Sequence, residues 1–388
     1  MEWIIAAFLS LALAFSVLGW RWERRMRRPP LTRTPLVSIL IPSYNNPHLP
    51  DAVASAKALD YPKKEILVVS EGTRPKVTGV QLLHSPVRQG KSRSLNQAVQ
   101  KAKGEILFFM DADTVADTDT LTKLVPWFRK GVAAVSPKFT VRNRTTLLTK
   151  LIGLEHQFIS SLFKIHMSFG SLISFRGCGI AISRDAFLRH GGWRETVIED
   201  TDLAARMVAA GDKILYDPHA VVRTVEPDTW AAYRQQRTRW GRGTAFSFLT
   251  HYRFYLKNPQ FSLYIFPYLL LFLAIGGFLL YQTSLALPAV SLYLIYTLSI
   301  REAVGLLALL AIPLVATYTG VGASVTAASI THFAIVTKSE RTSLKDLALT
   351  IPYVAVFFPM TISVYARGAL SAIADKRNRR PELDLRRW

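Results

Sequence analysis

The sequence predicts an α/β fold, in which a mostly parallel sheet is covered by helices on both faces and α-helical transmembrane segments lie at both ends of the chain. Short β-branched segments alternate with helical ones between residues 36 and 113, which is typical of a parallel sheet. Uncharged apolar runs occupy residues 3–20 and much of the chain beyond residue 260. Half of the residues are apolar and only 19% are charged, so part of the chain should lie in lipid.

Residues 1–20 are expected to form an N-terminal transmembrane helix. A basic cluster at residues 21–28 follows the apolar run, whereas a cleaved signal peptide carries its positive charge first. The positive-inside rule then places the first residue outside the cell and the following domain in the cytoplasm. Residues 21–35 are basic and contain prolines, and they form a predicted linker.

Residues 36–245 are expected to form one cytoplasmic domain. Apolar, β-branched runs bounded by polar residues or proline predict its first strands, and the segments between them favour helices. The predicted strands are 36–42, 65–69, 80–84 and 105–110, and the predicted helices are 51–59 and 92–103. Ligands of such sheets bind beyond the carboxyl ends of the strands, so polar residues at those ends are the first candidates for a site.

The C-terminal third is predicted to be membrane-associated. We expect an interfacial helix at 246–260, a bundle of about four spans with a further interfacial or re-entrant segment at 261–370, and a basic cytoplasmic tail at 371–388. The net charge of +21 indicates an anionic partner, which could be nucleic acid, a phosphate-bearing substrate or anionic lipid. Because many basic residues flank the apolar runs, membrane lipids are favoured and nucleic acid is not.

Two acids, Asp111 and Asp113, follow directly after an apolar strand. Paired carboxylates at a strand end suit a hard divalent cation such as Mg²⁺ or Mn²⁺, which would bridge a diphosphate and neutralise a leaving group. The alternative is a polar turn in which aspartate caps the next helix. A cysteine-rich zinc site is excluded because Cys178 is the only cysteine.

A basic segment, from Arg88 through Lys91 to Asn96, opens the predicted helix at 92–103. Helix N-termini attract phosphate through their free N–H groups and the helix dipole. The spacing differs from that of a Walker A loop, so this segment is not a P-loop. A solvated basic turn is the alternative interpretation.

An acidic triplet, which contains Glu199, Asp200 and Asp202, begins a later helix after the glycines at 191–192. One carboxylate could act as a general base toward a hydroxyl within hydrogen-bond reach. Asp200 is the favoured base and Glu199 the reserve. Simple N-capping of the helix is the alternative.

A fourth cluster joins Gln236, Arg239 and Trp240 in a helix that leads toward the apolar region. Arginine can clamp a diphosphate with two parallel hydrogen bonds, and the flat face of tryptophan suits a sugar ring. The alternative is an interfacial helix that is anchored by its tryptophan and arginine side chains.

Taken together, the order of these clusters over residues 36–245 resembles the membrane-bound branch of glycosyltransferase family 2, which includes synthases of cellulose, chitin, hyaluronan and poly-N-acetylglucosamine and is related to ceramide glucosyltransferase. The resemblance implies a GT-A type fold and gives each matching residue an expected role. Donor-binding residues would be Pro42, Tyr44, Glu71, Arg88, Lys91, Asp111, Gln236 and Arg239. Acceptor-binding residues would be Gly177, Cys178, Gly179 and Trp240.

Two positions depart from the family's pattern. Glu71 stands where the family usually has an aspartate that contacts the nucleoside, and Ile198 replaces the threonine before the Glu199–Asp200 pair. By contrast, the Q-x-x-R-W motif is matched without change by Gln236, Arg239 and Trp240. The identity of the nucleobase is therefore the least defined part of the resemblance.

The resemblance implies an inverting transfer from a nucleotide-sugar, most simply a UDP-sugar, at the cell membrane. The metal would be held by Asp111 and Asp113, and Asp200 would deprotonate the acceptor. The acceptor would be a growing polysaccharide or, alternatively, a lipid that receives one sugar. A transporter or receptor is disfavoured because the apolar segments contain few charges.

Overall fold

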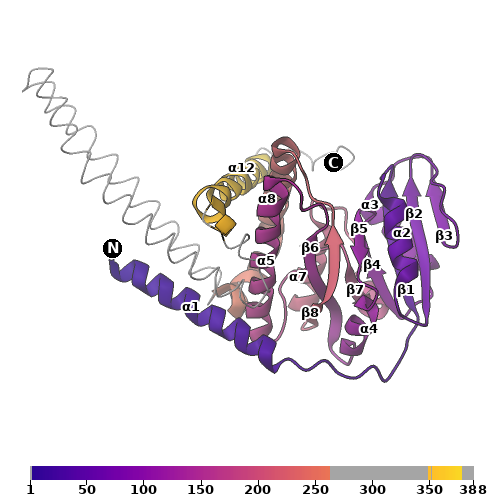
Figure 1. Ribbon diagram of the computed structural model, residues 1–388, viewed down its shortest axis with the longest axis horizontal. Coiled ribbons are helices and arrows are strands. Elements are labelled where there is room, and N and C mark those ends of the chain that lie inside the picture. Colours follow the sequence, from indigo (N-terminus) through magenta and orange to yellow (C-terminus); the bar gives the residue numbers. More distant parts are fainter. Residues whose placement is uncertain (1, 263–347, 351, 378–388) are drawn as a thin grey trace, which may run out of the picture.

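The computed structural model describes residues 2–262, 348–350 and 352–377, and a single eight-stranded sheet forms its centre (Figure 1). The strands are β1 (Val37–Tyr44), β2 (Lys64–Glu71), β3 (Gln81–Ser85), β4 (Ile106–Phe109), β5 (Thr114–Ala116), β6 (Val132–Val141), β7 (Ile180–Ser183) and β8 (Lys213–Thr224). Their order across the sheet is β3-β2-β1-β4-β7-β6-β8-β5.

Most strands of this sheet run in one direction. The first four in that order are parallel to one another, and β6 is parallel to β8. Two strands are reversed, since β7 is antiparallel to β4 and β6, and the edge strand β5 is antiparallel to β8. The prediction of a mostly parallel sheet is confirmed.

The helices surround the sheet. They are α1 (Glu2–Arg25), α2 (Leu49–Ala58), α3 (Lys91–Lys101), α4 (Thr120–Leu124), α5 (Leu147–Ser168), α6 (Arg184–Arg189), α7 (Glu199–Ala209), α8 (Trp230–Lys257) and α12 (Phe358–Arg377), with a 3₁₀ turn η1 (Val125–Trp127) and a π turn η3 (Tyr353–Phe357). Every strand and helix predicted between residues 36 and 110 is present, with slightly shifted ends.

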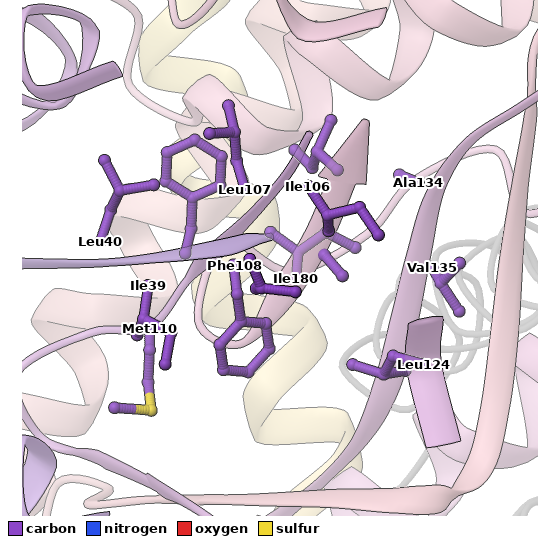
Figure 2. Close-up of a cluster of buried hydrophobic side chains, with 14 of the residues drawn as sticks. Ile39, Leu40, Ile106, Leu107, Phe108, Met110, Leu124, Ala134, Val135 and Ile180 are labelled. Carbon is purple, nitrogen blue, oxygen red and sulfur yellow. The ribbon is translucent and has the colours of Figure 1, made fainter. Parts of the chain in front are cut away.

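The centre of the sheet is buried on both faces. Five successive residues of β1, from Val37 to Ile41, are buried, and so are all four residues of β4. Because successive side chains of a strand point to opposite faces, both faces of these strands must be covered. Figure 2 shows the result, with Ile39 and Phe108 among the side chains that fill this core.

The parallel register brings the polar ends of separate strands to one edge. Tyr44 at the end of β1 is paired with Glu71 at the end of β2, and Leu40 of β1 is paired with Phe109, the last residue of β4. The segment after β4 therefore emerges beside the carboxyl ends of β1 and β2. This is the edge where open α/β sheets bind their ligands.

The end of α1 packs against α5, so the N-terminal helix is attached to the folded domain. Glu23 forms a 3.0 Å ion pair with Lys164 of α5, whose side chain is only 3% exposed. A Cβ atom on Gly19 would lie 3.1 Å from Ile165 Cγ1, which shows how closely the two helices approach. The helix extends to Arg25, beyond the predicted boundary at residue 20.

The predicted linker at 21–35 is partly helical and partly extended. Beyond α1, Arg28 binds Asp217 of β8 through two hydrogen bonds of 2.7 and 2.9 Å. Asp217 also accepts a 2.8 Å hydrogen bond from the indole of Trp127, so this buried carboxylate is fully engaged. The linker is therefore fixed to the side of the sheet.

The last helices form a pair beside the sheet, and Figure 1 shows α12 alongside α8. Gly368 of α12 packs directly on the backbone of Thr238 in α8, and Gly241 of α8 packs on the backbone of Tyr365. The predicted boundary between residues 245 and 246 falls inside α8, which continues to Lys257 and bends at His251 (φ −111°, ψ 23°).

Within the residues that the structure describes, no helix is long and apolar enough to cross a membrane. Most of the segment predicted to hold the C-terminal spans, residues 263–347, lies outside the described residues, as do residues 378–388 of the predicted tail.

A glycine in front of β4 allows a close backbone contact that any side chain would disturb. A Cβ atom on Gly104 would lie 2.5 Å from the backbone nitrogen of Ser38. We expect Gly104→Ala to lower the free energy of unfolding by about 3 kcal/mol, at the upper end of typical over-packing. Gly131→Ala is the control, since an added Cβ atom there meets no neighbouring atom. Its only penalty is the positive φ of 84°, which costs an alanine about 1–2 kcal/mol. Equal loss in the two variants, measured by thermal unfolding, would contradict this packing argument.

Candidate active site

One amine joins two of the predicted clusters. Lys91, the first residue of α3, lies 2.9 Å from Asp111 Oδ1 and 3.2 Å from Glu199 Oε1. Asp111 follows β4, and Glu199 is the first residue of α7. The acids predicted to bind metal and the acids predicted to include a base therefore lie in one site, on either side of Lys91.

The N-terminus of α3 is held in place by Glu71. Its carboxylate accepts hydrogen bonds from the Gly90 amide (3.3 Å) and from the Ser94 hydroxyl, and the residue is only 5% exposed. Gly90 has a φ of 100°, which brings the chain sharply into the helix. Glu71 was predicted to contact the nucleoside. Its two oxygens bind the Gly90 amide and the Ser94 hydroxyl, so Glu71 holds the segment that carries Lys91, and its contact with the nucleoside stays a prediction.

Two reciprocal hydrogen bonds between Asn96 and Trp193 hold α3 from its other side. The Asn96 amide donates to the Trp193 carbonyl (2.7 Å), and the Trp193 amide donates to Asn96 Oδ1 (3.0 Å). A Cβ atom on Gly192 would lie 2.7 Å from Asn96 Oδ1, so the turn must carry glycine there. Asn96 thus joins α3 to the turn that leads into α7.

Asp111 and Asp113 have the electrostatics of a cation site. Burial, together with the charge of Asp111, raises the pKa of Asp113 to about 6. Among the described residues, Lys91 is the only cation that forms an ion pair with any of the four acids of this site. It pairs with Asp111 and Glu199, whereas Asp113 and Asp200 have no ion pair there. The resulting surplus of negative charge favours a divalent cation at the aspartate pair.

The remaining ligands of such a cation would have to come from outside the protein. Among the described residues, no group of three or more His, Cys, Asp or Glu side chains could hold a metal ion. Magnesium sites of this kind use one or two carboxylates and complete the shell with water and substrate phosphates. Asp111 and Asp113 therefore fit a metal that arrives with a diphosphate.

Asp200 is held by two backbone amides and forms no ion pair among the described residues. Its Oδ2 accepts a 2.9 Å hydrogen bond from the Gly177 amide, and its Oδ1 accepts one of 2.7 Å from the Thr201 amide. Burial, followed by the charge of neighbouring Glu199, raises the pKa of Asp200 to about 6. Asp202 differs, because it is ion-paired with Arg206 (2.8 Å) and lies 2.8 Å from His251.

The glycine-containing loop at 177–179 lies against the proposed base. Gly177 supplies the amide that binds Asp200, and a Cβ atom there would lie 3.5 Å from Asp200 Oδ2. Gly179 has a φ of 100° and faces Val222 at close range, so it requires glycine. Burial and the charge of Asp111 raise the pKa of the Cys178 thiol, which therefore stays protonated and unreactive.

The Q-x-x-R-W segment lies in α8, and its members have different surroundings. Trp240 packs beside the Arg237 guanidinium, 4.1 Å from the ring centroid, and Arg176 lies 5.5 Å away. Gln236 Oε1 accepts a hydrogen bond from Arg237. Arg239 is half-buried and has no ion pair among the described residues, so its charge is available to an anionic ligand.

The predicted nucleoside end lies at the carboxyl ends of β1 and β2. Pro42 is half-buried within β1, whereas the Tyr44 ring is 50% exposed and lies 4.4 Å from the Arg88 guanidinium. Asn45 Oδ1 accepts a 2.8 Å hydrogen bond from the Thr73 amide, which holds the two strand ends together. Tyr44 is thus a half-exposed aromatic residue that packs beside Arg88.

A buried group of charged residues next to this site was not predicted from the sequence. Arg237 is 0% exposed and forms a 2.6 Å ion pair with Glu155 of α5. His156 of α5 binds Glu226 at 3.0 Å, and Arg176 Nη1 lies 3.0 Å from His156 Nε2. The adjacent Glu155 and His156 within α5 were the available signal for this group.

Comparisons with known proteins identify the family. The model of the family described as "Glycosyl transferase family group 2" matches residues 106–334. A poly-beta-1,6-N-acetyl-D-glucosamine synthase of Staphylococcus epidermidis is 26% identical over 244 residues, and that of Staphylococcus aureus strain COL is 24% identical over 246. Each match covers 59% of this chain and 59% of the relative's length.

Among solved structures, the mannosyltransferase PcManGT from Pyrobaculum calidifontis, in complex with GDP-Man and Mn²⁺, has a similar fold. The two superpose with a TM-score of 0.60 at 22% sequence identity, over 97% of this chain and 99% of that one. The likeness confirms the predicted α/β fold of GT-A type.

The raised pKa of Asp200 predicts a pH profile for any reaction in which this carboxylate is the general base. The base must be ionised, so the rate should fall about tenfold per pH unit below about pH 6. Glu199→Gln should move this limb to lower pH, since removing the Glu199 charge lowers the pKa of Asp200. Initial rates between pH 4.5 and 8 at saturating Mn²⁺ test both points. A rate that stays nearly constant down to pH 4.5 in the unmodified protein would exclude Asp200, with its raised pKa, as the base.

Proposed function

This chain belongs to the glycosyl transferase family group 2, and from that premise we propose that it transfers a sugar from a nucleotide-sugar, most simply a UDP-sugar, to a growing polysaccharide with inversion at the anomeric carbon. The observation that carries the proposal is the contact of Lys91 with both Asp111 and Glu199. This contact brings two groups of residues into one site. Asp111 suits a metal-bound diphosphate, and Glu199 is the neighbour of Asp200, which suits an acceptor base.

The chain's own residues divide the work between the two ends of the transferred sugar. Asp200 takes the proton from the acceptor hydroxyl, and its Oδ1 and Oδ2 are already aimed by the amides of Thr201 and Gly177. The hydroxyl oxygen attacks the anomeric carbon as the bond to the diphosphate breaks. Single displacement needs one carboxylate base, and the diphosphate leaves without a proton.

Positive charge at the leaving group is the second requirement. We assign to Lys91 and Arg239 the stabilisation of the negative charge that develops on the diphosphate. A bound Mg²⁺ or Mn²⁺ would be held by Asp111 and Asp113 and would supply further positive charge there. The Mn²⁺ and GDP-Man of the solved mannosyltransferase support a metal-dependent nucleotide-sugar donor.

The acceptor is proposed to lie between the 177–179 loop and Trp240. Gly177 contacts Asp200 directly, and Trp240 lies beside Arg176, the residue before that loop. The similarity to poly-beta-1,6-N-acetyl-D-glucosamine synthases favours a polysaccharide acceptor. Transfer of a single sugar to a lipid is the alternative, and product mass separates one addition from a ladder of lengths.

We further propose that the protein acts at the cell membrane with its catalytic domain on the cytoplasmic side. The support is in the sequence, where basic residues follow the apolar run at 3–20 and recur at 376–380. Nucleotide-sugars on that side would reach the edge of the sheet directly.

The function is tested first with a donor screen. Full-length protein would be incubated with Mn²⁺ and UDP-N-acetylglucosamine, UDP-glucose or GDP-mannose, together with an oligosaccharide primer or a lipid extract. Release of nucleoside diphosphate with a sugar-extended product supports the proposal. Absence of turnover with every donor and both acceptors would overturn it.

Replacing the proposed base should separate binding from transfer. We expect Asp200→Asn to bind nucleotide-sugar normally and to lose transfer by about a hundredfold to ten-thousandfold, which is the usual contribution of a general base. Asp202→Asn is the control on the same helix. Its carboxylate is engaged by Arg206 and His251, so the change should lower thermal stability and leave the transfer rate of the folded protein unchanged. Near-normal transfer by Asp200→Asn would assign the base to another group.

Replacing a proposed metal ligand should affect nucleotide affinity only when metal is present. We expect Asp113→Ala to lower the Mn²⁺-dependent affinity for UDP or GDP by at least about tenfold, with little change when metal is chelated. Asp117→Asn is the control, since Asp117 forms an ion pair with Arg223 away from Lys91. Isothermal titration with and without Mn²⁺ measures the difference. Equal affinities for the Asp113→Ala and unmodified proteins in Mn²⁺ would remove Asp113 from the site.

A further inference from the structure

Five charged or titratable side chains form a buried charge cluster beside the candidate site: Glu155, His156, Arg176, Glu226 and Arg237. They come from α5, from the loop before β7, from the segment after β8 and from α8. Glu155, His156, Glu226 and Arg237 are each at least nine-tenths buried. The cluster therefore joins four segments that are distant in the sequence.

The contacts within the cluster form a chain. Arg237 Nη2 binds Glu155 Oε2 at 2.6 Å and lies 3.9 Å from Glu226 Oε2. Glu226 Oε1 lies 3.0 Å from His156 Nε2, which in turn lies 3.0 Å from Arg176 Nη1. Burial and the charge of Arg176 lower the pKa of His156, so the imidazole is neutral and the two carboxylates balance the two guanidinium groups.

Stability alone does not account for this arrangement. Buried ion pairs are often replaceable by apolar side chains without loss of stability, because removing charge from water is so unfavourable. Here three buried polar atoms also lack a hydrogen-bond partner among the described residues, namely His156 Nδ1, Glu226 Oε2 and Arg237 Nε. Such a half-satisfied network in the core points to a role in the site next to it.

The cluster contacts the candidate site through Trp240, Gln236 and Gly177. Arg237 lies 4.1 Å from the centroid of the Trp240 ring and donates a hydrogen bond to Gln236. Arg176 also lies beside Trp240 and immediately precedes Gly177, whose amide binds Asp200. The positions of the tryptophan face and of the base therefore depend on where the two guanidinium groups are held.

We propose that Glu226 is a positioning residue for sugar transfer, which acts through Arg237 and Arg176 to orient Trp240 and the Gly177 amide toward the acceptor. This inference rests on the proposed function. The backbone of Glu226 is fixed independently, since its amide donates to Asn143 Oδ1 (2.9 Å) and its carbonyl accepts from Asn143 Nδ2 (2.7 Å). Loss of the Glu226 charge would leave two guanidinium groups with only Glu155, while the chain around residue 226 stays in place.

The kinetic test compares Glu226→Gln with a matched buried acid in full-length protein. With whichever donor of the screen is turned over, Glu226→Gln should lower kcat by about tenfold to a hundredfold, as misplacement of reacting groups does, and leave the KM for the nucleotide-sugar unchanged. Asp217→Asn is the control, because Asp217 is also buried and hydrogen-bonded to an arginine, Arg28, but does not belong to the buried charge cluster. It should lower thermal stability without changing kcat. An unchanged kcat in Glu226→Gln, or an equal fall in both variants, would overturn the proposal.

A spectroscopic test does not depend on turnover, so it remains decisive if the donor screen fails and the proposed function is wrong. Glu226→Gln should change tryptophan emission in the unmodified protein but not in a Trp240→Phe background. Unchanged emission, or a change that persists without Trp240, would contradict the link between Glu226 and Trp240. If Glu226→Gln fails to fold, Glu155→Gln takes its place in both tests, since Glu155 is the other acid that holds Arg237.

Discussion

The contact of the Lys91 amine with Asp111 and Glu199 is the interaction on which the site depends. Asp111 belongs to the edge of the parallel sheet, and Glu199 begins a helix nearly ninety residues later in the chain. Without a cation between them, these two acids would repel each other. Glu71 and Asn96 hold the two ends of the segment that carries Lys91, so the amine is fixed before any ligand arrives.

The site contains four carboxylates, and among the described residues Lys91 is the only cation ion-paired with any of them, so negative charge is in excess. Burial and the charge of a neighbouring acid raise the pKa of both Asp113 and Asp200. Such a concentration of negative charge lowers the stability of the folded protein, and it is retained where function needs it. The same shortage suits a metal diphosphate at Asp113 and a carboxylate base at Asp200, so one electrostatic condition serves both halves of the proposed transfer.

Helix α8 links the site to the rest of the molecule. One side of it supplies Gln236, Arg239 and Trp240, and another side inserts Arg237 into the buried charge cluster with Glu155. The close packing of Gly241 and Gly368 against opposing backbone sets α12 directly on this helix. A helix held on several sides by charge and close packing is well suited to present a rigid aromatic face to an acceptor.

The sequence by itself determined the α/β class, the strands and helices up to residue 110, and the acidic and basic clusters at strand ends and helix starts. These features follow from local periodicity and from residue types, which are visible in a short window of sequence. Only the tertiary structure decided how those clusters are used. Glu71 binds the start of α3, Asp202 contacts His251, and Glu226 contacts His156. Each of these contacts joins side chains from separate segments of the chain, whose orientation depends on packing. Local pattern carries no information about such long-range pairings, so the division of roles among the charged residues could come only from the folded chain.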